Sequence, residues 1–195
     1  MDMARTLGWM AVAFFFCAEW GAEAGVSSNS IRHIPLVPDF DLGRYLGTWH
    51  EIARLPHRFE RDLEQVTATY RLREDGRIRV INRGLNTTTG RWSEAEGRAW
   101  VPDPKIPARL KVSFFLFFAA DYRVVALDPE DYSYTMVTSG NKKYLWILSR
   151  RPSMNEVVYR DLVKKARGWG FEVDQLIRVR QKEGEKREKI LTNNP

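Results

Sequence analysis

Four cationic side chains lie close together in the segment RLPHRFER, residues 54–61: Arg54, His57, Arg58 and Arg61. Guanidinium groups bind carboxylates and phosphates through paired, charge-assisted hydrogen bonds. We therefore expect this segment to hold the anionic head group of a ligand, with His57, Arg58 and Arg61 as contacts. The same segment and the residues after it carry three acids, Glu60, Asp62 and Glu64. These acids could instead neutralise the cations in a solvated loop, and the sequence leaves both interpretations open.

The sequence gives little support for catalysis. It contains no G-x-S-x-G, no H-E-x-x-H and no glycine-rich phosphate loop, the signatures of common hydrolases, zinc proteases and nucleotide-binding proteins. The histidines are scattered, and the single cysteine, Cys17, lies near the N-terminus. We expect that the protein is not an enzyme and that it has neither a metal site nor a cofactor. An enzyme that uses the interior of the fold as its active site is the alternative, with Glu51 and Asn82 as its polar candidates.

Eight segments have the composition and alternation of β-strands, and they span residues 47–53, 65–72, 77–83, 92–101, 109–118, 122–127, 132–139 and 143–149. Turn signals such as Glu74-Asp75-Gly76 and Asp128-Pro129 separate them. Short turns between consecutive antiparallel strands predict an up-and-down sheet, and closing that sheet into a barrel removes its exposed edges. We expect an all-β fold built on an eight-stranded antiparallel barrel, which is wide enough for one small ligand.

One helix is expected after these strands. Ser153 and Glu156 have the spacing of a capping box at its start, and Gly168 and Gly170 supply its end. Its apolar stripe consists of Met154, Val157, Val158, Leu162 and Ala166. The stripe predicts that the helix packs against the outside of the sheet. A short final strand is expected over residues 175–181.

Alternation along the strands predicts which side chains face the interior of the barrel. The row Ala95, Gly97 and Ala99 is notable because such small side chains cannot fill an interior by themselves. It favours a cavity, although small residues could also relieve crowding at a bent strand. The residues expected to contact a ligand in the lumen are Ala68, Tyr70, Val80, Asn82, Gly97, Val112, Phe114, Tyr122 and Trp146.

The N-terminal residues have the pattern of a signal peptide. Arg5 precedes an apolar run over 7–18, and Ala22-Glu23-Ala24 has the small residues of a cleavage site. Cys17 follows three phenylalanines instead of small residues, which disfavours a lipid anchor there. The protein is then expected to be exported, either periplasmic or peripheral at the outer membrane, or secreted if its source is eukaryotic. The expected segments are a signal peptide over 1–24, an extended lead-in over 25–43, the barrel domain over 44–181 and a charged tail over 182–195.

The charge balance narrows the choice of partners. Loss of residues 1–24 would raise the net charge from +6 to +8, because one arginine and three acids leave with them. A basic protein suits nucleic acid, an anionic membrane surface or an anionic small ligand. Export makes nucleic acid the least suitable of the three, so we expect none. A basic adaptor in peripheral contact with a membrane through its tail is a further alternative.

Three short motifs occur in order on the expected strands: Gly47-Thr48-Trp49, Asp121-Tyr122 and Arg150. They match the three motifs of the lipocalin family, which the chain resembles over nearly all of its exported part. The segments YLGTWHEIARLPHRFER and YLWILSR are especially similar to bacterial lipocalins of the outer-membrane lipoprotein type. Apolipoprotein D and the plant temperature-induced lipocalins are more distant relatives.

The resemblance assigns roles to several residues. It implies that Gly47, Trp49 and Arg150 are structural, with the tryptophan closing one end of the barrel and the arginine crossing its ring in a contact worth about 0.5 to 2 kcal/mol. The cation cluster then lies at the open mouth. The resemblance also implies a carrier or storage protein that holds a fatty acid or lysophospholipid and serves envelope lipid maintenance. Relatives of this type form dimers, so a homodimer is a further expectation.

Overall fold

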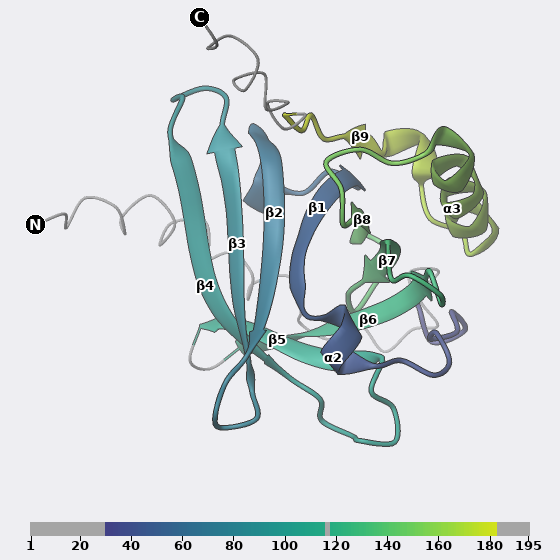
Figure 1. Ribbon diagram of the computed structural model, residues 1–195. Coiled ribbons are helices and arrows are strands. Elements are labelled where there is room, and N and C mark those ends of the chain that lie inside the picture. Colours follow the sequence, from purple (N-terminus) through teal and green to yellow (C-terminus); the bar gives the residue numbers. More distant parts are fainter. Residues whose placement is uncertain (1–29, 116–117, 183–195) are drawn as a thin grey trace, which may run out of the picture.

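An antiparallel β-sheet that closes on itself forms the body of the molecule (Figure 1). The computed structural model describes residues 30–115 and 118–182. The strands of the barrel wall are β1 (Gly47–Arg54), β2 (Leu63–Leu72), β3 (Ile78–Asn86), β4 (Trp92–Trp100), β5 (Arg109–Phe115), β6 (Phe118–Leu127), β7 (Tyr134–Thr138) and β8 (Leu145–Ser149). Each strand pairs with the next along the chain, and β1 pairs with both β8 and β2. The predicted eight-stranded up-and-down barrel is confirmed.

Several strand bounds differ from the prediction, among them those of β3, which ends at Asn86, and those of β6 and β7. β6 begins at Phe118 because this residue pairs with Phe115 of β5. β7 begins only at Tyr134, because Tyr132 has a positive φ of 52° and its N–H donates to the carbonyl of Asp128 in a turn. These deviations depend on turn geometry, which strand composition does not encode.

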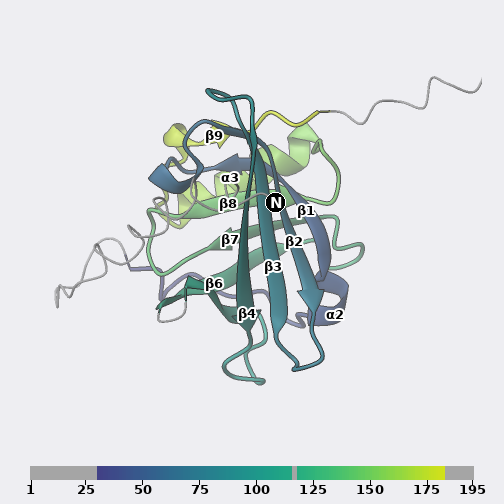
Figure 2. The same cartoon turned by 90° about the vertical axis from the view of Figure 1, so that its left-hand side faces the viewer.

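β4 and β5 are hydrogen-bonded over a short stretch. Arg98–Trp100 of β4 lie opposite Lys111–Ser113 of β5. β4 is paired with β3 along its whole length, and Figure 2 shows β2, β3 and β4 side by side. Within the two described ranges, residues 92–97 of β4 have no β5 partner.

Helix α3 (Glu156–Gly168) packs against the outside of the barrel beside β7 and β8 (Figure 1). Its buried residues Leu162 and Ala166 belong to one hydrophobic cluster with Ile52, Met136 and Ile147 of the strands. This cluster lies on the outer face of the sheet, because the ligand cavity described below is lined by other residues of the same strands. The expected position of the helix is confirmed.

The start of α3 differs from the expected capping box. The N-cap is Asn155, whose side-chain oxygen accepts a hydrogen bond from Val157 N at 2.8 Å. The predicted cap at Ser153 is wrong. The carbonyl of Ser153 instead accepts a hydrogen bond from Ser149 Oγ at 3.2 Å, which belongs to the turn after β8.

The segment before β1 contributes to the core. Ile31 and Ile34 are buried in the cluster beneath α3, and Phe40 is buried at the other side of the molecule beside Tyr45. A short helix, α2 (Leu42–Tyr45), follows, with Asp41 as its N-cap. The described part of the expected lead-in is thus packed against the barrel, and it ends in a helical turn.

The chain after α3 returns to the barrel. A 3-10 turn, η3 (Val173–Gln175), leads to β9 (Ile177–Arg178), which pairs with Ala53 and Arg54 of β1. β9 is shorter than the expected strand because η3 takes its first residue, although Val179 N still donates to the carbonyl of Ile52 and the carbonyl of Arg180 accepts from Gln65 N. The expected signal peptide, Cys17 and nearly all of the charged tail lie outside the described residues. Among residues 30–115 and 118–182, no helix is long and apolar enough to cross a membrane.

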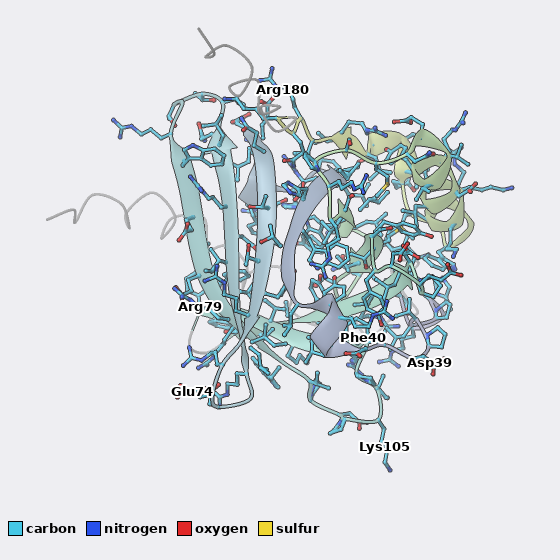
Figure 3. All side chains as sticks on the ribbon, in the orientation of Figure 1. Asp39, Phe40, Glu74, Arg79, Lys105 and Arg180 are labelled. Atoms are coloured by element: carbon cyan, nitrogen blue, oxygen red, sulfur yellow. The ribbon has the colours of Figure 1, made fainter. Side chains whose placement is uncertain are left out.

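The two ends of the barrel differ in what covers them. α2 and the connections β2–β3, β4–β5 and β6–β7 lie at one end, and Figure 3 labels Phe40, Glu74 and Lys105 there. The loop between β1 and β2, which contains the 3-10 turn η2 (Arg58–Glu60), lies at the opposite end, on the side of Arg180 in Figure 3. These ends are called the closed end and the mouth below.

Candidate ligand-binding site

The barrel encloses a cavity of about 460 Å³, mostly lined by apolar and aromatic side chains. This volume lies in the usual range of small-molecule sites, roughly 300–1,000 Å³. Eight of the residues expected in the lumen line it: Ala68, Tyr70, Val80, Asn82, Val112, Phe114, Tyr122 and Trp146. The structure thus brings residues of β2, β3, β5, β6 and β8 together around one space.

Gly97, the remaining lumen candidate, is not among the lining residues. A Cβ atom at this position would lie 2.7 Å from the Phe114 ring and 2.8 Å from the carbonyl oxygen of Ser113. Gly97 therefore gives the Phe114 ring room to lie against β4. Of its small neighbours, Ala95 lines the cavity, whereas Ala99 is fully buried in the cluster at the closed end. At Gly97 the small side chain relieves crowding, as the alternative interpretation held.

Trp49 and Arg150 meet at the closed end. The Trp49 side chain is fully buried, and its Nε1 donates to the carbonyl of Tyr45 at 2.9 Å. The Arg150 guanidinium carbon lies 3.8 Å from the centre of the Trp49 ring. Gly47 has a positive φ of 101°, and a Cβ there would lie 3.1 Å from Arg150 Nη1. The spacing Gly47-Thr48-Trp49 thus reflects both a backbone conformation and the space that the arginine occupies.

Three tyrosine hydroxyl groups are hydrogen-bonded just above this end. Tyr122 Oη lies 2.6 Å from Tyr45 Oη and accepts a hydrogen bond from Tyr70 Oη at 3.1 Å. Burial raises the pKa of Tyr70 to about 12 and raises those of Tyr45 and Tyr122 well above their ordinary value. Tyr70 and Tyr122 line the cavity. Its floor is therefore uncharged at neutral pH and carries hydroxyl groups.

The cations expected at the mouth are divided between two places. Arg54 is buried, and its guanidinium donates to Glu51 Oε1 at 2.8 Å and to the carbonyl of Leu63. His57 lines the cavity. Arg58 and Arg61 line a neighbouring depression, together with the β9 residues Ile177 and Arg178, and Arg54 and His57 border this depression as well. The structure brings one of the three expected head-group contacts, His57, to the cavity.

Two further residues of the mouth were not identified from the sequence as ligand contacts. Phe59 and Glu60 of η2 line the cavity. Trp146 Nε1 donates to Glu60 Oε2 at 3.2 Å, and His57 Nε2 lies 3.2 Å from the same oxygen. The sequence carries no signal for this arrangement because the direction of a loop side chain does not follow strand alternation. Glu51 lies two residues after Trp49 on β1, so alternation places both side chains on the same, inward face of the strand. Glu51 does line the cavity.

Glu51 and Glu60 have opposite protonation preferences. Burial raises the pKa of Glu51 well above its ordinary value, and the charge of Glu60 adds to the effect beyond what Arg54 offsets. Burial also disfavours the ionised form of Glu60, but the charge and hydrogen bond of His57, with the charge of Arg54, lower its pKa overall. Of the two carboxyl groups, Glu51 is therefore the one that more readily holds a proton, and Glu60 the one that more readily carries the charge.

A closed eight-stranded barrel with an outer helix, an aromatic plug at one end and an apolar cavity open at the other defines a binding protein of the lipocalin type. A family model described as "Lipocalin-like domain" matches residues 40–181. The chain belongs to the lipocalin family. Lipocalins are in general binding or carrier proteins for small hydrophobic ligands.

Individual relatives indicate which lipocalins the chain resembles in sequence and in fold. The chain is 48% identical over 150 residues to the outer membrane lipoprotein Blc of Escherichia coli K12, covering 77% of this chain and 84% of the relative. It is 36% identical over 126 residues to apolipoprotein D of Bos taurus, covering 62% and 66%. Among solved structures, insecticyanin of the tobacco hornworm Manduca sexta superposes with a TM-score of 0.63 at 23% identity, covering 77% of this chain and 85% of that one. The resemblance to the bacterial lipoprotein branch is confirmed.

Proposed function

We propose that this lipocalin carries or stores a single-chain lipid, a fatty acid or a lysophospholipid, with its acyl chain in the barrel cavity. The observation that carries the proposal is the cavity of about 460 Å³, which is apolar along its walls and closed at one end by Trp49. Burial of an acyl chain there would contribute about 0.8 kcal/mol per methylene group. The polar groups Glu51, His57 and Glu60 lie at the mouth, where the head group of such a lipid would be.

The proposal extends to the cell envelope. The bacterial relatives of 47 to 48% identity are named outer membrane lipoproteins. An exported carrier at the envelope would move or hold lipids that carry one chain, which are the lipids released when a membrane is damaged or remodelled. Peripheral contact with the membrane would let such a lipid pass between the bilayer and the cavity.

We infer a binding role without catalysis. The sequence holds none of the common hydrolase or nucleotide-binding signatures, and the polar groups at the mouth are engaged with one another. A chemical step on a bound lipid would instead appear as a new product after incubation. Incubating the folded protein with a lysophospholipid and finding free fatty acid by mass spectrometry would contradict the inference.

Displacement of an environment-sensitive fluorophore tests lipid binding. We expect fatty acids and lysophospholipids of 16 to 18 carbons, the chain lengths chosen for the test, to displace the fluorophore at one site per chain. Ala68→Phe is the cavity-filled variant for comparison, because Ala68 lines the cavity and a larger ring there would fill part of it. Saturating lipid that leaves the fluorophore bound to the correctly folded protein would contradict the proposed function.

A further inference from the structure

Two carboxyl groups interrupt the apolar wall near the mouth. Glu51 on β1 and Glu60 in η2 both line the cavity, and the Glu51 residue is 3% exposed. Arg54 Nη1 donates to Glu51 Oε1 at 2.8 Å, and Arg54 Nε lies 3.6 Å from Glu60 Oε2. One guanidinium therefore faces two carboxyl groups, and full ionisation of both would leave a negative charge at this place.

His57 adds an unpaired acceptor to the same place. Its side chain is 5% exposed, and Nε2 lies 3.2 Å from Glu60 Oε2. Nδ1 and Nε2 are both buried and lack a hydrogen-bond partner in the described part of the chain. Whenever the imidazole is neutral with its proton on Nε2, on the side of Glu60, Nδ1 presents a lone pair. Because a buried acceptor without a partner is unfavourable, an N–H group of a ligand would be stabilised there.

Aromatic rings surround these acceptors. His57, Phe59 and Trp146 all line the cavity, and the His57 ring centre lies 5.3 Å from those of both Phe59 and Trp146. Trp146 also fixes Glu60 through its indole N–H. Aromatic faces attract cations, most strongly where water is excluded. The rings and the carboxyl groups therefore favour the same kind of ligand group.

The charge of the cavity wall is opposite to that of the whole protein. The chain has a net charge of +6, yet the described residues that line the cavity include no lysine or arginine. Other acids of this wall are balanced elsewhere: Glu96 pairs with Arg79 at 2.6 Å, and Asp121 pairs with Lys111 at 3.1 Å. Glu94 also lines the cavity, but Glu51 and Glu60 are the two acids of this wall that share one guanidinium, that of Arg54.

We propose that the mouth of the cavity is a subsite for a protonated amine, and that the protein selects single-chain lipids with an amine-bearing head group over those with a purely anionic one. The subsite consists of Glu51, Glu60, the free Nδ1 of His57 and the ring of Trp146. The proposal rests on the proposed lipid-binding function and specifies its head group. It replaces the expected anion site of Arg58 and Arg61, which lie in the neighbouring depression.

Binding of the amine is coupled to the protonation of Glu51. In the free protein, burial and the charge of Glu60 raise the pKa of Glu51, which favours its protonated form. An ammonium group beside Glu51 favours the carboxylate, so the proton leaves to solvent as the amine binds. Arg54, Glu60 and, through Glu60, His57 face Glu51, and Tyr70 is the phenol close enough to feel its charge. Because the carboxylate form of Glu51 attracts the ammonium group, affinity for the amine rises with pH.

Two lysophospholipids whose head-group alcohols are ethanolamine and glycerol test the subsite, because the first carries an ammonium group and the second does not. Lysophosphatidylethanolamine and lysophosphatidylglycerol with the same acyl chain share the phosphate, the glycerol backbone and the tail. We expect the amine-bearing lipid to bind about tenfold more tightly at pH 8. This ratio should shrink at pH 6, and calorimetry in buffers of different ionisation enthalpy should show proton release for the amine-bearing lipid alone. Equal affinities at both pH values would overturn the proposal.

Substitutions show which residues produce the preference for the amine-bearing lipid. Glu51→Gln keeps a side chain that can bond to Arg54 but cannot ionise, so the ratio should fall to about two and lose its pH dependence. Glu96→Gln is the matched control: it removes a carboxylate of the same wall that is bound by Arg79, and the ratio should stay unchanged. A ratio that survives both Glu51→Gln and Glu60→Gln would overturn the proposal. The pH series on the unsubstituted protein decides the question if a variant does not fold.

The same measurements separate the two proposals. Binding of both lysophospholipids and of an uncharged monoacylglycerol with equal affinity would keep the carrier function and overturn the amine subsite. Failure of all three lipids to displace the fluorophore would overturn the carrier function and, with it, the subsite.

Discussion

Arg150 is held at the closed end by more than its contact with Trp49. Besides crossing the Trp49 ring, its guanidinium donates to the carbonyl groups of Arg44, Tyr45, Leu46 and Thr48 at 2.8 to 3.1 Å. These carbonyls belong to α2 and the start of β1. A single cation therefore joins the last strand of the barrel to the segment that closes it.

Arg150→Ala should lower the free energy of unfolding by about 2 to 4 kcal/mol, because both the ring contact and charge-assisted hydrogen bonds are lost. Urea unfolding checks this value, with the adjacent exposed Arg151→Ala as the control, expected within about 0.5 kcal/mol of the parent protein. Lipid affinity of the folded variant should change little, since the mouth is at the other end. A collapse of affinity with unchanged stability would show that the closed end and the mouth have been assigned the wrong way round.

The pH dependence of stability is a second test at the scale of residues. The pKa of Glu51 is raised in the folded state above its ordinary 4.5, so the folded protein binds more protons than the unfolded chain above that pH. Stability should therefore fall as pH rises from about 5, by at most about 1.4 kcal/mol per pH unit. Glu51→Gln should remove this component, and urea unfolding at several pH values measures it. The same slope in parent and variant would contradict the assignment of the proton to Glu51.

The residues of the site were predictable where regular structure determines their direction. Alternation identified Tyr70, Val112 and Trp146 as interior, and a family motif identified Trp49 and Arg150. The loop residues were not predictable in this way. Whether Glu60 or Arg58 faces the cavity depends on the turn η2 and on bonds to residues distant in sequence, such as Trp146.

At the scale of elements, the packing of β4 against β5 requires a glycine at position 97. The ring of Phe114 on β5 lies where the side chain of any other residue would be, beside the short pairing of Arg98–Trp100 with Lys111–Ser113. The sequence showed a row of small residues but not which neighbour uses the space, because the register of β4 against β5 is a tertiary feature. This ring also forms part of the cavity wall.

Gly97→Ala should therefore destabilise the protein by about 1 to 3 kcal/mol, the usual range for forcing an extra methyl group into a packed site. It should also alter lipid affinity, because the Phe114 ring must move. Gly168→Ala at the end of α3 is the control, since no atom lies within 4 Å of its Cβ position. Thermal unfolding and fluorophore displacement measure the two effects. A variant as stable as the Gly168→Ala control would contradict the packing described for β4 and β5.

Element type was easier to predict than element ends. The strands and the outer helix follow from hydrophobic periodicity, which persists over many residues. The cap of α3 follows from a single hydrogen bond, which the Asn155 side chain accepts from Val157 N. Several residues near each end could have made such bonds, and the sequence does not rank them.

At the scale of the whole molecule, the arginines that make the protein basic and the ligand cavity occupy different places. The protein is basic, and arginines such as Arg58, Arg61 and Arg178 lie around a depression outside the lumen. The cavity combines apolar walls, a hydroxyl-bearing floor and a carboxyl pair at its mouth. The basic exterior suits approach to an anionic envelope surface, whereas the interior suits an apolar chain with an amine-bearing head.

The central claim, that the barrel holds one single-chain lipid, is tested most directly by mass spectrometry of the lipids bound to the protein when it is exported and purified without detergent. The account predicts close to one single-chain lipid per protein, enriched in amine-bearing head groups over the total lipid extract, and a much lower content in Ala68→Phe. No bound single-chain lipid, or the same content in the cavity-filled variant, would contradict it.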